Sequence, residues 1–170
     1  MRLFIAIQFT PEIKKELTRF QNDLKRNGLT GRFVPVENLH LTLAFIGEYP
    51  NPDDVLDVLE QVPFTPFDLS LGSAGQFGDL YWCGIDNAIG LEAYVRRLRR
   101  ALAESGIPFD KKKFSPHITL VRRGQLLRED AIAITKTPEG AMHASRVSLI
   151  RSDRGKAGMI YTEVGAVEAE

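Results

Sequence analysis

The chain has 170 residues, of which 44% are hydrophobic and 26% charged, close to the average for a soluble globular protein. This length fits one domain and excludes a multidomain machine. The 22 basic and 22 acidic residues cancel, so the overall charge gives no bulk attraction to nucleic acid or to an anionic membrane.

The first elements follow from the spacing of apolar residues. A buried strand is expected over residues 2–9, followed by a helix that begins at Thr10-Pro11-Glu12 and ends at Asn27-Gly28. Its apolar residues repeat at helical spacing: Ile13, Leu17, Phe20 and Leu24. A second strand over 39–46 and a short second helix over 55–62 continue a β-α-β-α order.

The second half of the chain gives weaker signals. Strands are predicted over 67–71 and 80–85, on either side of a turn at 72–78, and a third helix carries Leu91 to Leu102. Further strands are expected over 118–121, 147–150 and 160–167, the last two joined by a mobile polar loop at 151–158. Helices and strands without strict alternation predict an α+β fold, with two similar lobes sharing one core in a single domain of residues 1–170.

The single cysteine and the absence of a long apolar run bear on location. Cys83 excludes an internal disulfide and a multi-cysteine metal site, and we expect it to be buried as a small hydrophobe in the strand over 80–85. No apolar run approaches the ~18–20 residues of a transmembrane helix. We therefore expect a cytoplasmic protein without membrane contact, and the neutral charge favours a monomer.

Charge is unevenly distributed along the sequence. Residues 33–95 contain ten acidic residues and no Lys or Arg, so the remainder carries an equal excess of positive charge. We interpret the arginines in 96–100 as the solvated face of a helix. Residues 111–113 and 151–156 form two further basic segments, which either follow an RNA backbone or only keep the surface soluble.

The strongest signal is a repeated tetrapeptide. His40-Leu41-Thr42-Leu43 and His117-Ile118-Thr119-Leu120 lie 77 positions apart and include two of the three histidines. In a strand, residues i and i+2 project from the same face, so each motif places an imidazole beside a hydroxyl. Two such strands could face one another across a groove.

Paired imidazoles and hydroxyls suit phosphoryl transfer. One histidine can take a proton from a nucleophile while the other gives a proton to a leaving oxygen. The hydroxyls of Thr42 and Thr119 can bind phosphate oxygens, and Arg122 can stabilise their charge without a metal. No third nitrogen or sulfur ligand lies near either motif, so we expect no zinc, and the third histidine, His143, is interpreted as a surface or strand residue.

The motifs resemble the signature of the two-histidine phosphoesterase superfamily. The chain is most similar to its RNA 2′,3′-cyclic phosphodiesterases, also called the 2′-5′ RNA ligase family. Beyond the motifs, the similarity rests on residues 1–7, 32–39 and 45–48 and on Tyr161-Thr162. The chain has Phe33 where many members have Trp, and Ala44 where Arg is common.

This resemblance implies two pseudo-twofold-related lobes around a central cleft, each with a sheet and with helices on the outside. It implies hydrolysis of RNA 2′,3′-cyclic phosphate ends to 2′-phosphomonoesters without a cofactor or metal. His40 would be the proton donor to the departing 3′-oxygen and His117 the proton acceptor that activates water. Thr42, Thr119 and Arg122 would bind the phosphate. From the residues alone, one histidine must be acid and the other base.

Two alternatives stay open. One is a nucleotide- or RNA-binding module without turnover, which the basic segments would suit. The other is an enzyme of the same superfamily that acts on another cyclic phosphate or on a 2′-5′ linkage. Phe4 or Phe9 could stack on a base, although a place in the core is the favoured interpretation.

Overall fold

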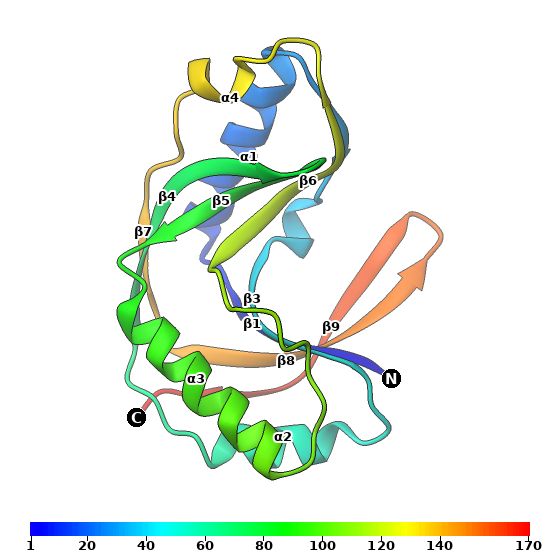
Figure 1. Ribbon diagram of the computed structural model, residues 1–170, viewed down its shortest axis with the longest axis vertical. Helices are drawn as coiled ribbons and strands as arrows, with labels where there is room; N and C mark the ends of the chain where they lie inside the picture. Colours follow the sequence, from blue (N-terminus) through cyan, green and yellow to red (C-terminus); the bar gives the residue numbers. More distant parts are fainter.

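The computed structural model describes residues 1–170 and consists of two antiparallel sheets with helices on their outer sides (Figure 1). The first sheet has the strand order β3 (His40–Glu48), β1 (Arg2–Gln8), β8 (Arg146–Gly155), β9 (Gly158–Glu168). The second sheet has the order β2 (Leu29–Phe33), β6 (His117–Leu126), β5 (Leu80–Asp86), β4 (Phe67–Phe77), β7 (Ala141–Ala144). The helices are α1 (Pro11–Arg26), α2 (Pro52–Glu60), α3 (Ile89–Glu104) and α4 (Ala131–Ile134), with a 3-10 turn η1 (Val36–Asn38). The predicted α+β fold is confirmed.

Helix α1 forms where the sequence predicts it. The hydroxyl of Thr10 accepts a hydrogen bond from the amide of Ile13 at 3.3 Å, and Pro11 is the first helical residue. The hydroxyl satisfies one free amide group of the first helical turn, and Pro11, which has no amide hydrogen, leaves one fewer group without a partner. The predicted apolar residues of this helix are all buried: Ile13, Leu17, Phe20 and Leu24.

Each of the two long helices packs on the other sheet, not on the sheet whose strand precedes it in the chain; we call these the exchanged helices. Helix α1 follows β1 of the first sheet but packs on β2 and β6 of the second, and α3 follows β5 of the second sheet but packs on β3 of the first. Figure 1 shows α1 on the side of β4, β5 and β6, and α2 with α3 on the side of β1, β3 and β8. One cluster of 37 buried residues includes side chains of both sheets, so the two halves share a hydrophobic core.

The structure corrects two predictions in the second half of the chain. The turn expected at 72–78 is wrong, because β4 continues to Phe77 and the reversal takes place at Gly78 and Asp79. The mobile loop expected at 151–158 is also wrong, because these residues form the end of the β8–β9 hairpin, which extends away from the body of the molecule (Figure 1). Most of the hairpin's end is exposed, so it lacks the alternation of apolar residues that identifies a strand.

The prediction of a fully solvated arginine run is wrong for one residue. Arg96 and Arg100 are exposed, but Arg99 turns inward, donates to the carbonyl of Lys112 at 2.6 Å and lies over the rings of Phe109 and Phe114. The run therefore contains one arginine that joins α3 to the segment leading into β6.

Cys83 is buried in β5, as predicted. Burial raises the pKa of its thiol to about 12. The strand β2, the short helix α4 and the strand β7 were not predicted from the sequence.

Candidate active site

Each histidine of the repeated motif is the first residue of a strand, and the two strands belong to different sheets. His40 and Thr42 lie on β3, His117 and Thr119 lie on β6, and these two strands are in contact. Leu41 and Ile118, which separate the histidine from the threonine in each motif, are fully buried. The imidazole and hydroxyl of each motif therefore share the half-buried face of their strand.

Both imidazoles are held in the same way. The Nδ1 atom of His40 lies 2.7 Å from the carbonyl oxygen of Asn38, and Nδ1 of His117 lies 2.6 Å from that of Ser115. A carbonyl can only accept, so each Nδ1 carries the proton and donates it. In the neutral form of either ring, Nε2 is therefore the proton acceptor.

Asn38 anchors the first histidine to the β8–β9 hairpin. Its side chain is buried and donates to the carbonyl oxygen of Met159 at 3.0 Å. Its backbone carbonyl accepts the hydrogen bond from Nδ1 of His40. The hairpin thereby helps to fix the ring of His40. The sequence offered no signal for this role, because the contact joins residues far apart in the chain.

Aromatic rings and the neighbouring threonine surround His40. The centroids of the Phe4 and Tyr161 rings lie 4.8 and 5.3 Å from that of the imidazole, and Nε2 is 2.9 Å from the hydroxyl oxygen of Thr42. Burial lowers the pKa of His40, the carbonyl of Asn38 opposes this effect, and the positive charge of Arg122 lowers the pKa further. In the absence of an anion, this environment favours the neutral imidazole.

A β-bulge lies at the last residue of each motif. In the pairing of β3 with β1, Leu43 has no partner between Thr42 and Ala44, and in the pairing of β6 with β5, Leu120 has none between Thr119 and Val121. The side chains of both doublets, Leu43 with Ala44 and Leu120 with Val121, are buried. An extra residue reverses the alternation of a strand.

The bulges determine which later residue lies on the same face of the strand as each histidine. Without the extra residue, the fifth position after the histidine would face the core; with it, Phe45 and Arg122 return to the face of His40 and His117. Phe45 packs against the cluster of Phe4, Ala6 and Ile150. The effect of Arg122 on the pKa of His40 indicates that its guanidinium lies near the histidine of the other sheet.

The exchanged helices reach the two bulges from equivalent positions. Gln21 and Arg99 are each the eleventh residue of a 16-residue helix. The carboxamide of Gln21 donates to the carbonyl oxygens of Leu120 at 2.9 Å and Val34 at 3.0 Å, and the guanidinium of Arg99 lies 3.5 Å from the carbonyl oxygen of Leu43. Each helix thus supports the bulge of the motif strand that it covers.

Comparison with known protein families shows which family this chain belongs to. Residues 9–156 match the model of the 2′-5′ RNA ligase superfamily. The chain belongs to this superfamily. The resemblance found in the sequence is thereby confirmed.

Members of the superfamily with known names and structures are similar over most of the chain. An RNA 2′,3′-cyclic phosphodiesterase of Escherichia coli is 34% identical over 149 residues, which cover 82% of the chain and 78% of that protein. Another, from Geobacillus stearothermophilus, is 31% identical over 132 residues, 72% of the chain but 42% of that longer protein. The apo crystal structure of Escherichia coli LigT has a TM-score of 0.83 at 28% identity, and the alignment covers 99% of this chain and 96% of LigT. LigT has also been crystallised with 3′-AMP.

Of the other candidate residues, some lie at the site and others lie elsewhere in the molecule. Phe4 lies beside His40, whereas Phe9 is part of the main core. His143 is exposed on β7 and pairs with Asp68 of β4, with Nδ1 2.8 Å from the carboxylate. Sequence reasoning did not assign Phe77, whose ring centroid lies 5.5 Å from that of His117.

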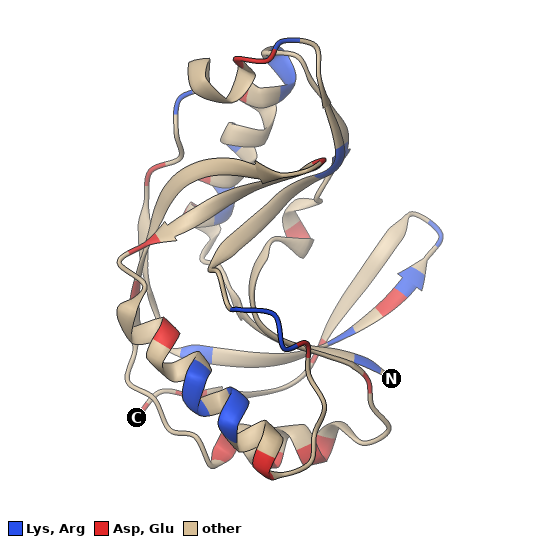
Figure 2. Ribbon diagram, in the orientation of Figure 1, with Lys and Arg blue, Asp and Glu red and all other residues tan.

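The predicted basic segments lie on two separate parts of the surface. Figure 2 shows basic residues between α3 and β6, where 111–113 lie, and at the end of the β8–β9 hairpin, which carries Arg154 and Lys156. Arg151 of the hairpin is paired with Asp153 at 2.8 Å. Whether either segment contacts RNA stays a prediction.

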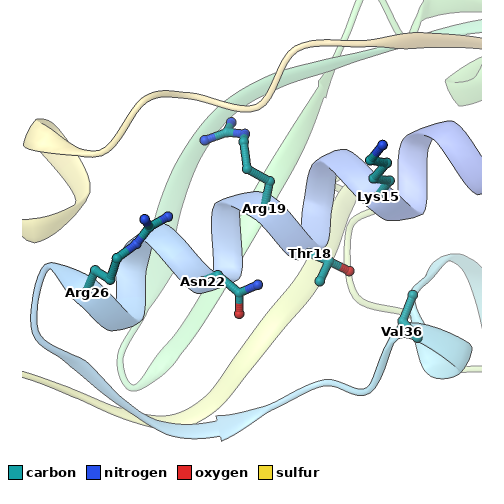
Figure 3. Close-up of a pocket in the computed structure, with 6 residues that line it drawn as sticks. All are labelled: Lys15, Thr18, Arg19, Asn22, Arg26 and Val36. Carbon is teal, nitrogen blue, oxygen red and sulfur yellow. The ribbon is translucent and has the colours of Figure 1, made fainter.

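A depression of about 430 Å³ lies on α1, lined by residues that include Lys15, Arg19 and Arg26 but neither motif histidine (Figure 3). Its arginines are already paired: Arg19 with Glu16 and Asp23, and Arg26 with Asp23. Most of its positive charge is therefore neutralised within the helix. No group of three or more His, Cys, Asp and Glu side chains is arranged to hold a metal ion, and no helix is both long and apolar enough to cross a membrane.

Proposed function

We propose that this protein hydrolyses RNA 2′,3′-cyclic phosphate ends to 2′-phosphomonoesters, without a metal, in the groove between β3 and β6. The predicted class of enzyme, a phosphodiesterase, is confirmed by the curated relatives. The observation that carries the proposal is the matched pair of imidazoles. Both are fixed through Nδ1 by a backbone carbonyl, so proton transfer would use Nε2, which in His40 lies against the hydroxyl of Thr42.

In the proposed reaction, His117 Nε2 takes a proton from water as the water oxygen bonds to phosphorus. The bond from phosphorus to the 3′-oxygen breaks, and His40 gives its Nε2 proton to that oxygen. Attack and departure on opposite sides of phosphorus require the two groups to come from opposite sides of the groove. The motif strands belong to different sheets, which supports this arrangement.

His40 must be protonated to act as the donor. Burial and Arg122 lower its pKa in the free protein, but a cyclic phosphate carries a negative charge, which favours the imidazolium once it is bound. Thr42, which contacts His40 Nε2, and Thr119, its equivalent on β6, are proposed to donate to the nonbridging oxygens. Arg122 is proposed to balance the charge that these oxygens gain.

The proposal extends to the setting of the enzyme. Both sheets act as one catalytic unit over residues 1–170, the partner is an RNA or oligonucleotide end, and the protein is a cytoplasmic monomer. The shared core of 37 residues supports a single unit, and the lone buried Cys83 suits a reducing compartment. Analytical ultracentrifugation tests the monomer.

The deciding experiment is hydrolysis of a short RNA with a 2′,3′-cyclic phosphate end, in chelator, with identification of the product isomer. We expect 2′-phosphate from the wild type and a loss of roughly 10²–10⁴-fold in kcat for His40→Ala and for His117→Ala. His143→Ala is the matched control, since this histidine is exposed and outside the site, and it should keep wild-type activity.

Two outcomes would contradict the proposal. If chelator abolishes hydrolysis, the reaction depends on a metal. If the wild type binds a 2′-phosphate nucleotide but forms no product over hours, the protein is a binding module. Competition between the RNA and other cyclic phosphates or 2′-5′ linked dinucleotides then defines the preferred ester.

A further inference from the structure

An aromatic pair beside His117 has no part in the proposed chemistry. Phe77 is 51% exposed, and its ring stands nearly perpendicular to the imidazole of His117, at 81° and 5.5 Å between centroids. The ring of Trp82 lies 5.0 Å from that of Phe77. These two rings form an aromatic surface beside His117, which we call the Phe77–Trp82 platform.

Strand pairing puts the platform on the same face as the second motif. Trp82 of β5 is paired with Thr119 of β6 on one side and with Gly75 of β4 on the other. A Cβ atom at Gly75 would lie only 2.5 Å from Cζ2 of Trp82, so the indole rests directly on the backbone of β4. Phe77 follows two residues later on the same face, at the last pair before the turn.

Stability alone does not explain this arrangement. Half of the Phe77 ring is left in water, which forgoes part of the free energy gained by burying an aromatic side chain. The indole nitrogen Nε1 of Trp82 is buried without a hydrogen-bond partner, which is also unfavourable. A ligand stacked on the platform would remove the first of these features by covering the exposed ring of Phe77.

We propose that the Phe77–Trp82 platform stacks on the base of the nucleotide that carries the cyclic phosphate. This inference rests on the proposed function. One ribose separates the base from the phosphate, so a phosphate held by His117 and Thr119 leaves the base next to Phe77. Aromatic rings stack on any base, and the platform therefore gives affinity with little sequence preference.

The aromatic residues of the first sheet are less suited to stacking. Phe4 is only 3% exposed, because its ring lies against both His40 and Tyr161. A base has no open face of Phe4 to cover. Phe77 is the large aromatic residue that combines contact with a motif histidine and a half-exposed ring.

The chain contains its own probe for this contact. Trp82 is the only tryptophan, so intrinsic tryptophan fluorescence reports on the platform alone. We expect adenosine 2′-phosphate to change the emission of the wild type, and ribose 5-phosphate, which has no base, to leave it unchanged. Phe77→Leu should weaken the binding of adenosine 2′-phosphate roughly 5- to 150-fold, the range measured for loss of one aromatic stacking partner. Leu127→Ala, at a residue 80% exposed and outside the groove, is the control and should bind as the wild type.

A comparison of two substrates separates stacking from support of His117. Adenosine 2′,3′-cyclic phosphate and methyl riboside 2′,3′-cyclic phosphate differ only in the base. If the platform binds the base, Phe77→Leu lowers kcat/KM for the first substrate and leaves kcat/KM for the second unchanged. If Phe77 only supports His117, both values fall by the same factor and the proposal is wrong.

Failure of the proposed function is recognised separately. A wild type that hydrolyses neither substrate, but whose fluorescence changes with adenosine 2′-phosphate and not with ribose 5-phosphate, retains the platform and loses the enzyme assignment. A wild type that hydrolyses both substrates equally well, with no change in fluorescence, retains the enzyme assignment and loses the platform.

Discussion

Gln21 gives the most direct test of how the fold supports the site. Its carboxamide is buried and donates to the carbonyl oxygens of Leu120 and Val34. Gln21→Met keeps the size and helix propensity of the side chain but removes both donors. Leu120 keeps the amide of Val34 as a donor at 2.9 Å, whereas the carbonyl of Val34 loses the donor that Gln21 provides.

The expected cost is the sum of two unequal losses. One hydrogen bond to an acceptor that keeps another donor contributes about 1 kcal/mol, and a carbonyl left unsatisfied costs about 1–3 kcal/mol. Because Val34 is only half-buried, water replaces part of the second loss. We expect Gln21→Met to lower the free energy of unfolding by about 2 kcal/mol.

The bulge that Gln21 supports also sets the position of Arg122, so activity should fall as well. A displacement of about 1 Å can cost up to ~100-fold in rate, and we expect a loss of roughly 10- to 100-fold in kcat/KM under conditions where the variant is folded. Urea denaturation and initial rates measure the two effects. Asn22→Met, at the exposed neighbour on the same helix, is the matched control. If Gln21→Met equals this control in both measurements, the bulge does not depend on Gln21 and the reasoning fails.

Three further predictions concern charge, burial and the thiol. Arg122 lowers the pKa of His40, so Arg122→Gln should raise that pKa and move the limb of the kcat/KM profile set by His40 to higher pH; an unmoved profile contradicts the contact. Arg99→Met should lower the free energy of unfolding by about 1–3 kcal/mol through loss of its short hydrogen bond, whereas exposed Arg100→Met should change it by less than about 0.5 kcal/mol in the same urea titration. Cys83, with its pKa near 12, should resist a thiol reagent at pH 8 until urea unfolds the protein, and rapid labelling of the native state would show that β5 opens.

The sequence predicted what local patterns encode. The motif is visible as a tetrapeptide that occurs twice. The amphipathic helix α1 and the α+β class follow from periodicity in single segments, and the structure agrees with both. The bulges could not be predicted in this way, because an extra residue is defined only against the partner strand. Arg122 lies three residues after Thr119, and simple alternation assigns such an odd spacing to the opposite face of the strand. The sequence alone therefore could not explain why Arg122 reaches the site.

The supporting roles of Gln21 and Arg99 could not be predicted from the sequence for a related reason. Gln21 and Arg99 are polar residues on amphipathic helices, where most polar residues face water. Their hydrogen bonds to Leu120 and Leu43 exist because each helix covers the sheet it did not come from. The end of the β8–β9 hairpin was interpreted as a loop because it has too little burial to show an alternating pattern.

The exchange of helices also has a consequence for motion. In many enzymes with a groove between two halves, the halves close on the substrate as a hinge bends. Here α1 and α3 each pass from one half to the other and are buried there, so opening the groove would pull helices out of the shared core. We therefore expect the distance between the two imidazoles to change little when a substrate binds.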